Sequence, residues 1–268
     1  MTIIKDSAHI RIGEADLYCE VSGSGPTIML VPGAGGDAGQ YDTLTNALAP
    51  HHRVIAYDRR GNSRSTTLEG KAATTVEEQA DDALALLASL GIRDATVFGN
   101  STGALIALAM GLRSTGSVGR LVLHEPTLLG IVGDPNAALA DVQPVIAAGM
   151  QQGGFAGGTE AFLRFAAGDA YELIPDAARE RILGNGRVLF EAEFGAFSSW
   201  VPDADKLASL ASQAVVLSAE TTAPAFREAA EWLAERVGTT VHVVPGGHMG
   251  FLDDPVAFAA LIAAPIAA

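Results

Sequence analysis

The stretch that most constrains the fold runs from Ala95 to Leu108 and reads Ala-Thr-Val-Phe-Gly-Asn-Ser-Thr-Gly-Ala-Leu-Ile-Ala-Leu. A short apolar, β-prone run leads into the Gly-Asn-Ser-Thr-Gly turn at residues 99–103, and an Ala- and Leu-rich run of helical character follows directly. This order predicts a strand, a sharp turn and a helix, with Ser101 at the apex of the turn. Glycine suits both ends of so tight a turn because a side chain there would collide with neighbouring backbone.

The meaning of Ser101 depends on this context. A Gly-x-Ser-x-Gly pattern alone is a weak signal in a chain with 30 glycines. Between a strand and a helix it is the pattern of a nucleophile elbow, which raises a serine hydroxyl above the carboxyl end of a sheet, next to a helix N-terminus. The competing interpretation is an ordinary strand-to-helix turn in which Ser101 caps the helix.

The rest of the chain alternates strand-like and helix-like segments, which predicts an α/β fold with a doubly wound, mostly parallel sheet. The expected strands are continuous apolar or alternating runs bounded by turn residues. Thr75, with Glu78 at capping-box spacing, predicts the start of a long helix that Gly91 ends. Eight strands are expected, at residues 9–12, 15–21, 27–31, 53–58, 96–98, 120–124, 214–218 and 240–244.

This alternation breaks down between residues 127 and 212. We interpret that segment as a mostly helical cap, or lid, inserted after the sixth strand, with residues 1–126 and 213–268 forming the core. Within it, Phe190, Phe194 and Phe197 recur at helical spacing in a helix-like run. Such a stripe is typical of a packed core, although the inner face of a lid can also bind a ligand.

Charge and cysteine content bound the class of function. The formal net charge of −14 argues against nucleic acid and against an anionic membrane surface as partners. No apolar run reaches the length needed to span a bilayer, and the first twenty residues lack an apolar signal core. Cys19 is the only cysteine, which excludes an intrachain disulfide and a thiolate metal cluster. The cytoplasm is therefore the expected compartment.

Two polar or glycine-rich loops follow predicted strands. The Pro-Gly-Ala-Gly-Gly-Asp run at residues 32–37 is either a flexible connection or a nest of backbone N–H groups for an anion or a developing oxyanion. A phosphate-binding loop is disfavoured because no Gly-Lys-Ser/Thr follows, and Gly-x-Gly-x-x-Gly is absent. The polar run at residues 58–65 is interpreted as a hydrogen-bonded structural loop.

Four motifs together carry a family resemblance: Pro-Gly-Ala-Gly-Gly at 32–36, Asp-Arg-Arg-Gly at 58–61, Gly-Asn-Ser-Thr-Gly at 99–103 and Gly-Gly-His at 246–248. In this order, the chain resembles the α/β-hydrolase family over essentially its whole length. It is most similar to the lidded branch that contains small esterases, lactonases, C–C hydrolases and cofactor-free haloperoxidases. The family usually has histidine at the position of Pro32, a departure that leaves the backbone donors in place.

The resemblance implies the roles of four residues. Ser101 corresponds to the nucleophile and His248 to the general base that takes its proton. Of the six histidines, only His248 lies on a glycine-bracketed loop after the final strand. The backbone N–H groups of Ala34 and Thr102 correspond to the oxyanion donors.

The third member of the triad is less clearly indicated. The family most often places its acid in the turn after the strand at 214–218, where the aligned residue here is Thr222, which carries no charge. Some members place the acid after the preceding strand, where this chain has Glu125. Glu125 is the favoured acid, and Glu220 or no acid at all are the alternatives; Glu125 could also be a helix N-terminal acid or the partner of a buried arginine.

These inferences predict a serine hydrolase that cleaves an ester, lactone, thioester or related acyl bond of a small, largely apolar molecule. Ser101 disfavours the dehalogenase and epoxide-hydrolase chemistries of this fold, which need a carboxylate nucleophile. The alternatives are a weakly catalytic or non-catalytic binding protein for small hydrophobic molecules, and a biosynthetic enzyme for acyl transfer or cyclisation. No cofactor and no metal are expected, and a homodimer is compatible with the sequence.

Overall fold

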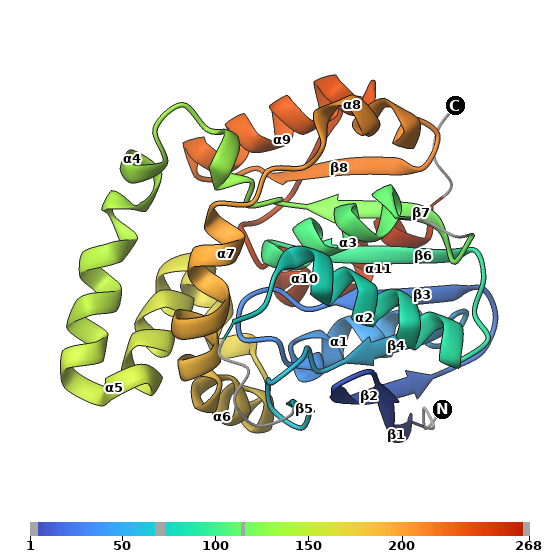
Figure 1. Ribbon diagram of the computed structural model, residues 1–268, viewed down its shortest axis with the longest axis horizontal. Coiled ribbons are helices and arrows are strands. Elements are labelled where there is room, and N and C mark those ends of the chain that lie inside the picture. Colours follow the sequence, from blue (N-terminus) through green and yellow to red (C-terminus); the bar gives the residue numbers. More distant parts are fainter. Residues whose placement is uncertain (1–4, 68–72, 114–115, 265–268) are drawn as a thin grey trace.

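The computed structural model describes residues 5–67, 73–113 and 116–264 (Figure 1). These residues form a nine-stranded sheet in the order β1-β2-β4-β3-β6-β7-β8-β9, with the short strand β5 beside β2. The strands are β1 (Lys5–Ile12), β2 (Ala15–Ser22), β3 (Thr27–Val31), β4 (Arg53–Tyr57), β5 (Thr66–Thr67), β6 (Ala95–Asn100), β7 (Val118–His124), β8 (Ala214–Ala219) and β9 (Val241–Val244). The expected α/β class with a mostly parallel sheet is confirmed.

The sheet is parallel where the sequence places its chemistry. Strand β2 pairs antiparallel with β1, β4 and β5, whereas each neighbouring pair from β4 to β9 is parallel. The register aligns the strand ends: Val31 lies opposite Gly99, and His124 lies opposite both Asn100 and Leu217. The loops that follow these strands therefore leave the same edge of the sheet, which is where ligands bind in open parallel sheets.

Helices cover both faces of the sheet, and each face has its own hydrophobic core (Figure 1). One core contains buried side chains of α2 (Val76–Ser89), α3 (Thr102–Leu112) and α9 (Pro224–Val237). The other contains side chains of α1 (Asp42–Leu48), α10 (Gly250–Asp253) and α11 (Pro255–Ala263). A short 3₁₀ helix, η1 (Ala38–Tyr41), precedes α1. The central strands of the sheet are thus buried on both sides, as their continuous apolar sequences predict.

Residues 127–212, here called the lid segment, run between β7 and β8 and contain helices but no strand. Figure 1 shows α4 to α7 beside the sheet, at the left of the view. Helix α5 is two helices joined at a kink, because Gly153 and Gly154 leave helical geometry. The helices of the segment are η2 (Leu129–Ile131), α4 (Pro135–Ala140), α5 (Val142–Ala167), η3 (Gly168–Leu173), α6 (Asp176–Gly184), η4 (Val188–Glu193), α7 (Phe194–Ser198), α8 (Ala204–Leu207) and η5 (Ala208–Leu210).

Several strand ends differ from the expected bounds by a few residues, most of all at β1, which begins at Lys5 instead of residue 9. Apart from these ends, the structure differs from the expected elements in three places. Strand β5 is not predicted by the sequence, because two residues are too few to show an alternating pattern. Helix α10 is not predicted either, since it occupies one turn of an expected loop. The run at 188–200 is not a continuous α-helix: η4 is a π-helix that leads into α7. Among the described residues, no helix is both long and apolar enough to cross a bilayer.

Candidate active site

Ser101 occupies the tight turn between β6 and α3. Its backbone has φ 58° and ψ −127°, a region that non-glycine residues adopt only under strain. The flanking glycines are required by packing: a Cβ on Gly99 would lie 2.3 Å from the Gly103 carbonyl oxygen, and one on Gly103 would lie 2.2 Å from the Val31 carbonyl oxygen. The Ser101 side chain makes no capping hydrogen bond to α3. The turn therefore has the strained geometry of an elbow, with a hydroxyl that is not engaged as a helix cap.

His248 lies in the loop after β9, and its backbone is tied to the elbow. The Asn100 side-chain amide donates to the His248 carbonyl oxygen at 2.9 Å. The imidazole packs against the ring of Phe226, with 5.0 Å between ring centroids. Its Nδ1 lies 3.4 Å from Oε2 of Glu125. Ser101, His248 and Glu125 line the same cavity, so the structure brings together the three residues that the sequence analysis favoured.

Glu125 is a fully buried carboxylate directly after β7, with a φ of 52°. Its Oε1 accepts hydrogen bonds from the backbone N–H of Ala219 at 2.8 Å and from the Ser218 hydroxyl at 3.1 Å. Burial alone would raise the pKa of Glu125, but the hydrogen bond and charge of His248, with the Ala219 and Thr222 donors, lower that pKa to about 2. Glu125 is therefore an anion at neutral pH and is positioned to stabilise a positive charge on His248.

The two alternative positions for an acid have other surroundings. Thr222, at the position where the family most often has its acid, donates its hydroxyl to Oε2 of Glu125 at 2.8 Å. Glu220 is exposed to solvent and is absent from the residues that line the cavity. Thr222, which occupies the usual position of the acid, therefore contacts the carboxylate of Glu125. Of the two glutamates, only Glu125 contacts His248. The other two roles considered for Glu125 do not fit. It is not the partner of a buried arginine, because its side chain bonds to no arginine among the described residues. It is not an acid at a helix N-terminus, because a loop follows β7.

Two backbone N–H groups are candidates for binding an oxyanion. Ala34 and Thr102 both line the cavity beside Ser101. Within the described ranges, neither N–H has a hydrogen-bond partner. Gly35 and Gly36 have φ values of 84° and 58°, which shape the loop after β3. Two unpartnered donors next to a serine hydroxyl form an arrangement that can bind a developing negative charge.

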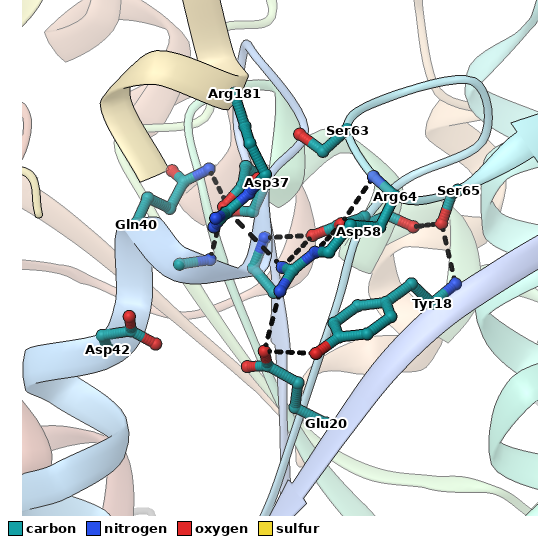
Figure 2. Close-up of polar contacts among 12 residues, drawn as sticks. Tyr18, Glu20, Asp37, Gln40, Asp42, Asp58, Ser63, Arg64, Ser65 and Arg181 are labelled. Atoms are coloured by element: carbon teal, nitrogen blue, oxygen red, sulfur yellow. Dashed lines mark hydrogen bonds and ion pairs between the residues drawn. The ribbon is translucent and has the colours of Figure 1, made fainter. Parts of the chain in front are cut away.

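The loop after β3 is held from outside by charged side chains, as Figure 2 shows for Asp37 and its neighbours. Arg181 of α6 donates to both oxygens of Asp37 at 2.6 and 2.8 Å. Asp58 accepts the backbone N–H of Ala38 at 2.8 Å and pairs with Arg64. The polar run at 58–65 is thus extensively hydrogen-bonded, as the sequence analysis expected, and it supports the glycine loop directly.

Sequence reasoning missed Arg59 as part of the site. Its side chain is fully buried and forms a bidentate ion pair with Glu193, at 2.7 and 2.8 Å. The same guanidinium donates to the Gly33 carbonyl oxygen at 3.0 Å. Arg59 and Glu193 lie 134 positions apart, and neither periodicity nor motif spacing links them. Only a three-dimensional structure reveals the pair.

The cavity has a volume of about 760 Å³ and lies between the loops of the core and the lid segment. Its walls are mainly apolar, and several aromatic side chains contribute to them. Of the phenylalanine stripe in the lid segment, Phe194 and Phe197 line the cavity while Phe190 packs against Phe194. Among the described residues, its lining contains aspartates and glutamates but no lysine or arginine. The apolar lining residues include Leu129, Val132, Leu139, Val142, Phe162, Phe165, Leu189, Phe194, Phe197 and Phe226.

The donor groups in the described part of the chain do not assemble a metal site. Within residues 5–67, 73–113 and 116–264, no cluster of three or more histidine, cysteine, aspartate or glutamate side chains has the placement needed to hold an ion. At the cavity, the functional groups are serine and threonine hydroxyls, one imidazole, carboxylates and backbone N–H groups. These are the groups of nucleophilic catalysis with general-base assistance.

Several known proteins with a similar sequence or fold are hydrolases. A family model described as the alpha/beta hydrolase family matches residues 28–261. The hydrolase YraK of Bacillus subtilis (strain 168) is 30% identical over 256 residues, which cover 94% of this chain and 92% of that protein. The solved structure of a thermophilic esterase from Thermogutta terrifontis has a TM-score of 0.74 at 22% identity, covering 98% of this chain and 97% of its own. The enol-lactonase from Burkholderia xenovorans LB400 has a TM-score of 0.72 at 21% identity, covering 95% of this chain and 98% of its own.

Proposed function

Because the chain belongs to the alpha/beta hydrolase family, we propose that it is a serine hydrolase that cleaves esters or lactones through an acyl-enzyme on Ser101. The observation that carries this proposal is the convergence of Ser101, His248 and Glu125 on one cavity, with His248 Nδ1 3.4 Å from Glu125 Oε2. An activated serine needs a base within reach and a group that orients the base. The three side chains supply these parts from the loops that follow strands β6, β7 and β9.

In the proposed mechanism, the Ser101 hydroxyl attacks the substrate carbonyl while His248 Nε2 accepts its proton. Glu125 keeps a proton on Nδ1 of His248 and stabilises the imidazolium that forms. The N–H groups of Ala34 and Thr102 donate to the oxyanion of the tetrahedral intermediate. The intermediate collapses to the acyl-enzyme, and His248 protonates the departing alkoxide. Water, activated by His248, then attacks the ester carbonyl, and the acid product leaves as the Ser101 hydroxyl is restored.

The cavity supports a neutral, largely apolar acyl substrate. A volume of about 760 Å³ falls within the range of pockets that hold drug-sized molecules. Phenylalanines and branched aliphatic side chains favour burial of an apolar acyl chain or ring, and the carboxylates disfavour a substrate that carries a free carboxylate. The esterase and lactonase names of the structural relatives agree with this substrate class. We further propose that the lid segment acts as the cover of this cavity.

The contacts of Glu125 also bear on the binding-protein alternative. That alternative depended on the absence of a carboxylate at the usual position, where this chain has Thr222. Since Thr222 donates to Glu125 and Glu125 contacts His248, the geometry favours catalysis over binding alone. Acyl transfer to an alcohol, or cyclisation, would use the same acyl-enzyme, and product analysis after the test below separates it from hydrolysis.

The test is intact-mass labelling with a p-nitrophenyl alkylphosphonate, which phosphonylates an activated serine and releases p-nitrophenolate. Wild type should gain one adduct per chain, and Ser101→Ala should gain none. Ser198→Ala is the matched control, because Ser198 also lines the cavity but does not lie at the elbow. That variant should be labelled like wild type. No adduct on folded wild type, or an adduct that survives in Ser101→Ala, would refute the proposal. Hydrolysis of neutral aryl esters and lactones should then require Ser101.

A further inference from the structure

The peptide bond between Gly33 and Ala34 is held through its carbonyl oxygen. The Gly33 carbonyl oxygen accepts two hydrogen bonds, one from Arg59 Nη2 at 3.0 Å and one from the Gly36 N–H at 3.1 Å. The N–H at the other end of this same peptide belongs to Ala34, which lines the cavity. Because a trans peptide is planar, fixing the direction of its C=O also fixes the direction of its N–H.

Arg59 is itself fixed with little freedom to move. The guanidinium donates to both carboxylate oxygens of Glu193 at 2.7 and 2.8 Å, and Nη1 also donates to Gln79 at 2.7 Å. The ring of Phe197 covers the guanidinium, with 5.5 Å from Cζ to the ring centroid. Glu193 and Phe197 belong to the lid segment, whereas Arg59 belongs to the core. The orientation of Arg59 therefore depends on the position of the lid segment.

Glu193 is almost completely buried, and its carboxylate is saturated with donors. In addition to Arg59, its Oε1 accepts from Asn62 at 3.0 Å and from Gln79 at 3.2 Å. A buried ion pair contributes little net stability compared with well-packed apolar side chains, because both charges lose their hydration. A role in positioning accounts for such a pair better than stability does.

We propose that Arg59 is a positioning residue of the reaction, which aims and polarises the Ala34 N–H through the Gly33 carbonyl, and that Glu193 of the lid segment orients it. A cationic donor on the carbonyl oxygen draws electron density from the amide and makes its N–H a stronger donor, since hydrogen bonds in a chain strengthen one another. The inference rests on the proposed function, because it assigns Ala34 as an oxyanion donor. Because Glu193 belongs to the lid segment, displacement of that segment would also weaken the Ala34 N–H as a donor.

The neighbouring residue offers a matched control. Arg60 is also buried and forms a bidentate ion pair, with Asp82 at 2.6 and 2.7 Å. Its guanidinium does not contact the Gly33 carbonyl. Arg59→Lys and Arg60→Lys each replace a fork of donors by a single ammonium in a buried ion pair. Only the first removes a donor from the Gly33–Ala34 peptide, so a difference between them reports on that peptide rather than on buried charge in general.

The experiment measures kcat and KM for an aryl ester on wild type and both variants, with kcat expressed per phosphonate-titrated site. It also measures inhibition by an aryl trifluoromethyl ketone, which forms a tetrahedral hemiketal on serine. Loss of a whole oxyanion donor lowers kcat by about 10²–10³, so a misaimed and less polarised donor should lower it about ten-fold. Arg59→Lys should therefore lower kcat about ten-fold and leave KM within about two-fold. It should also weaken inhibition by the ketone by the same factor as kcat. Arg60→Lys should leave all three within about two-fold.

Unchanged kcat per site in Arg59→Lys, a rise in KM alone, or equal losses in both variants would overturn the inference. If Arg59→Lys does not fold, Glu193→Gln against Asp82→Asn is the substitute pair, since each keeps the shape of the carboxylate partner and removes its charge. Glu193→Gln should lower kcat and ketone affinity together by several-fold, and wild-type values in that variant would overturn the inference. Failure of wild type to accept the phosphonate would instead refute the proposed function, so the two failures are distinguishable.

Discussion

Replacing Glu125 by glutamine tests the acid with little change of shape. Oε1 of Glu125 accepts the Ala219 N–H at 2.8 Å, and a backbone N–H can only donate. The amide oxygen of a glutamine must therefore stay at the Oε1 position, which places its NH₂ group at the Oε2 position. Oε2 is the atom that lies 3.4 Å from His248 Nδ1 and accepts the Thr222 hydroxyl at 2.8 Å.

This orientation has a specific chemical consequence. An NH₂ group facing His248 Nδ1 donates to it, so that the imidazole carries its proton on Nε2 and cannot accept the proton of Ser101. The same tautomer error, caused by an amide in place of the triad acid, lowers kcat by about 10⁴ in a serine protease. We expect Glu125→Gln to lower kcat by about 10³–10⁴ and to leave KM within about three-fold, because Glu125 acts on the reaction through His248.

The assay is aryl ester hydrolysis at neutral pH, with kcat expressed per phosphonate-titrated site so that misfolded protein does not count. Glu220→Gln removes a charge from the alternative position for the acid and should behave as wild type. Thermal unfolding of each variant shows whether the fold is retained. A folded Glu125→Gln enzyme within about ten-fold of the wild-type kcat would refute the reasoning, and a large loss in Glu220→Gln would transfer the acid's role to that residue.

Two further predictions concern stability. Burial, together with the nearby His248, lowers the pKa of His124 to about 3, although the charge of Glu125 opposes this shift. The unfolded chain therefore takes up a proton on this imidazole near pH 6.5, whereas the folded chain takes it up only near pH 3. The free energy of unfolding should fall as the pH drops through that window, by up to about 5 kcal/mol from this residue. Urea titrations at pH 7 and pH 4 should show a smaller fall for His124→Gln than for wild type. An equal fall in the two proteins would contradict the assignment. Gly99→Ala should lower the free energy of unfolding by about 3 kcal/mol and slow phosphonate labelling, because its Cβ would lie 2.3 Å from the Gly103 carbonyl oxygen. Gly184→Ala, whose Cβ would meet no atom within 4 Å, is the control and should do neither.

The sequence was sufficient for those parts of the fold that depend on local pattern. Strand β3 begins and ends at the predicted residues, Thr27 and Val31. A short continuous apolar run between turn residues is typical of a strand that is buried on both faces of a parallel sheet. The predicted capping of α2 is also confirmed: the Thr75 hydroxyl accepts the Glu78 N–H at 3.1 Å. In both cases the residues that determine the structure lie within a few positions of one another.

Contacts between distant segments could not be predicted in this way. The ion pair of Arg59 with Glu193 joins a loop of the core to a π-helix of the lid segment, and a π-helix has no periodicity that distinguishes it from an α-helix over six residues. The hydrogen bond of Thr222 to Glu125 is another such case. From the sequence, Thr222 indicated only that the usual acid was missing, whereas in the structure it supports the acid that stands elsewhere.

The two strained residues of the site share one structural cause. Ser101 and Glu125 are each the first residue after a parallel strand, and both have positive φ, at 58° and 52°. The N–H of Ser101 donates to the His124 carbonyl oxygen at 3.0 Å, and the N–H of Glu125 donates to the Leu217 carbonyl oxygen at 2.9 Å. Each strained residue is therefore still held by the hydrogen-bonding pattern of the sheet, one position beyond the end of its strand. Because strain persists only where the surroundings enforce it, the sheet itself fixes the turn at which each chain leaves it. The spacing between the hydroxyl and the carboxylate is then set by the separation of neighbouring strands, which makes it insensitive to movement of the lid segment.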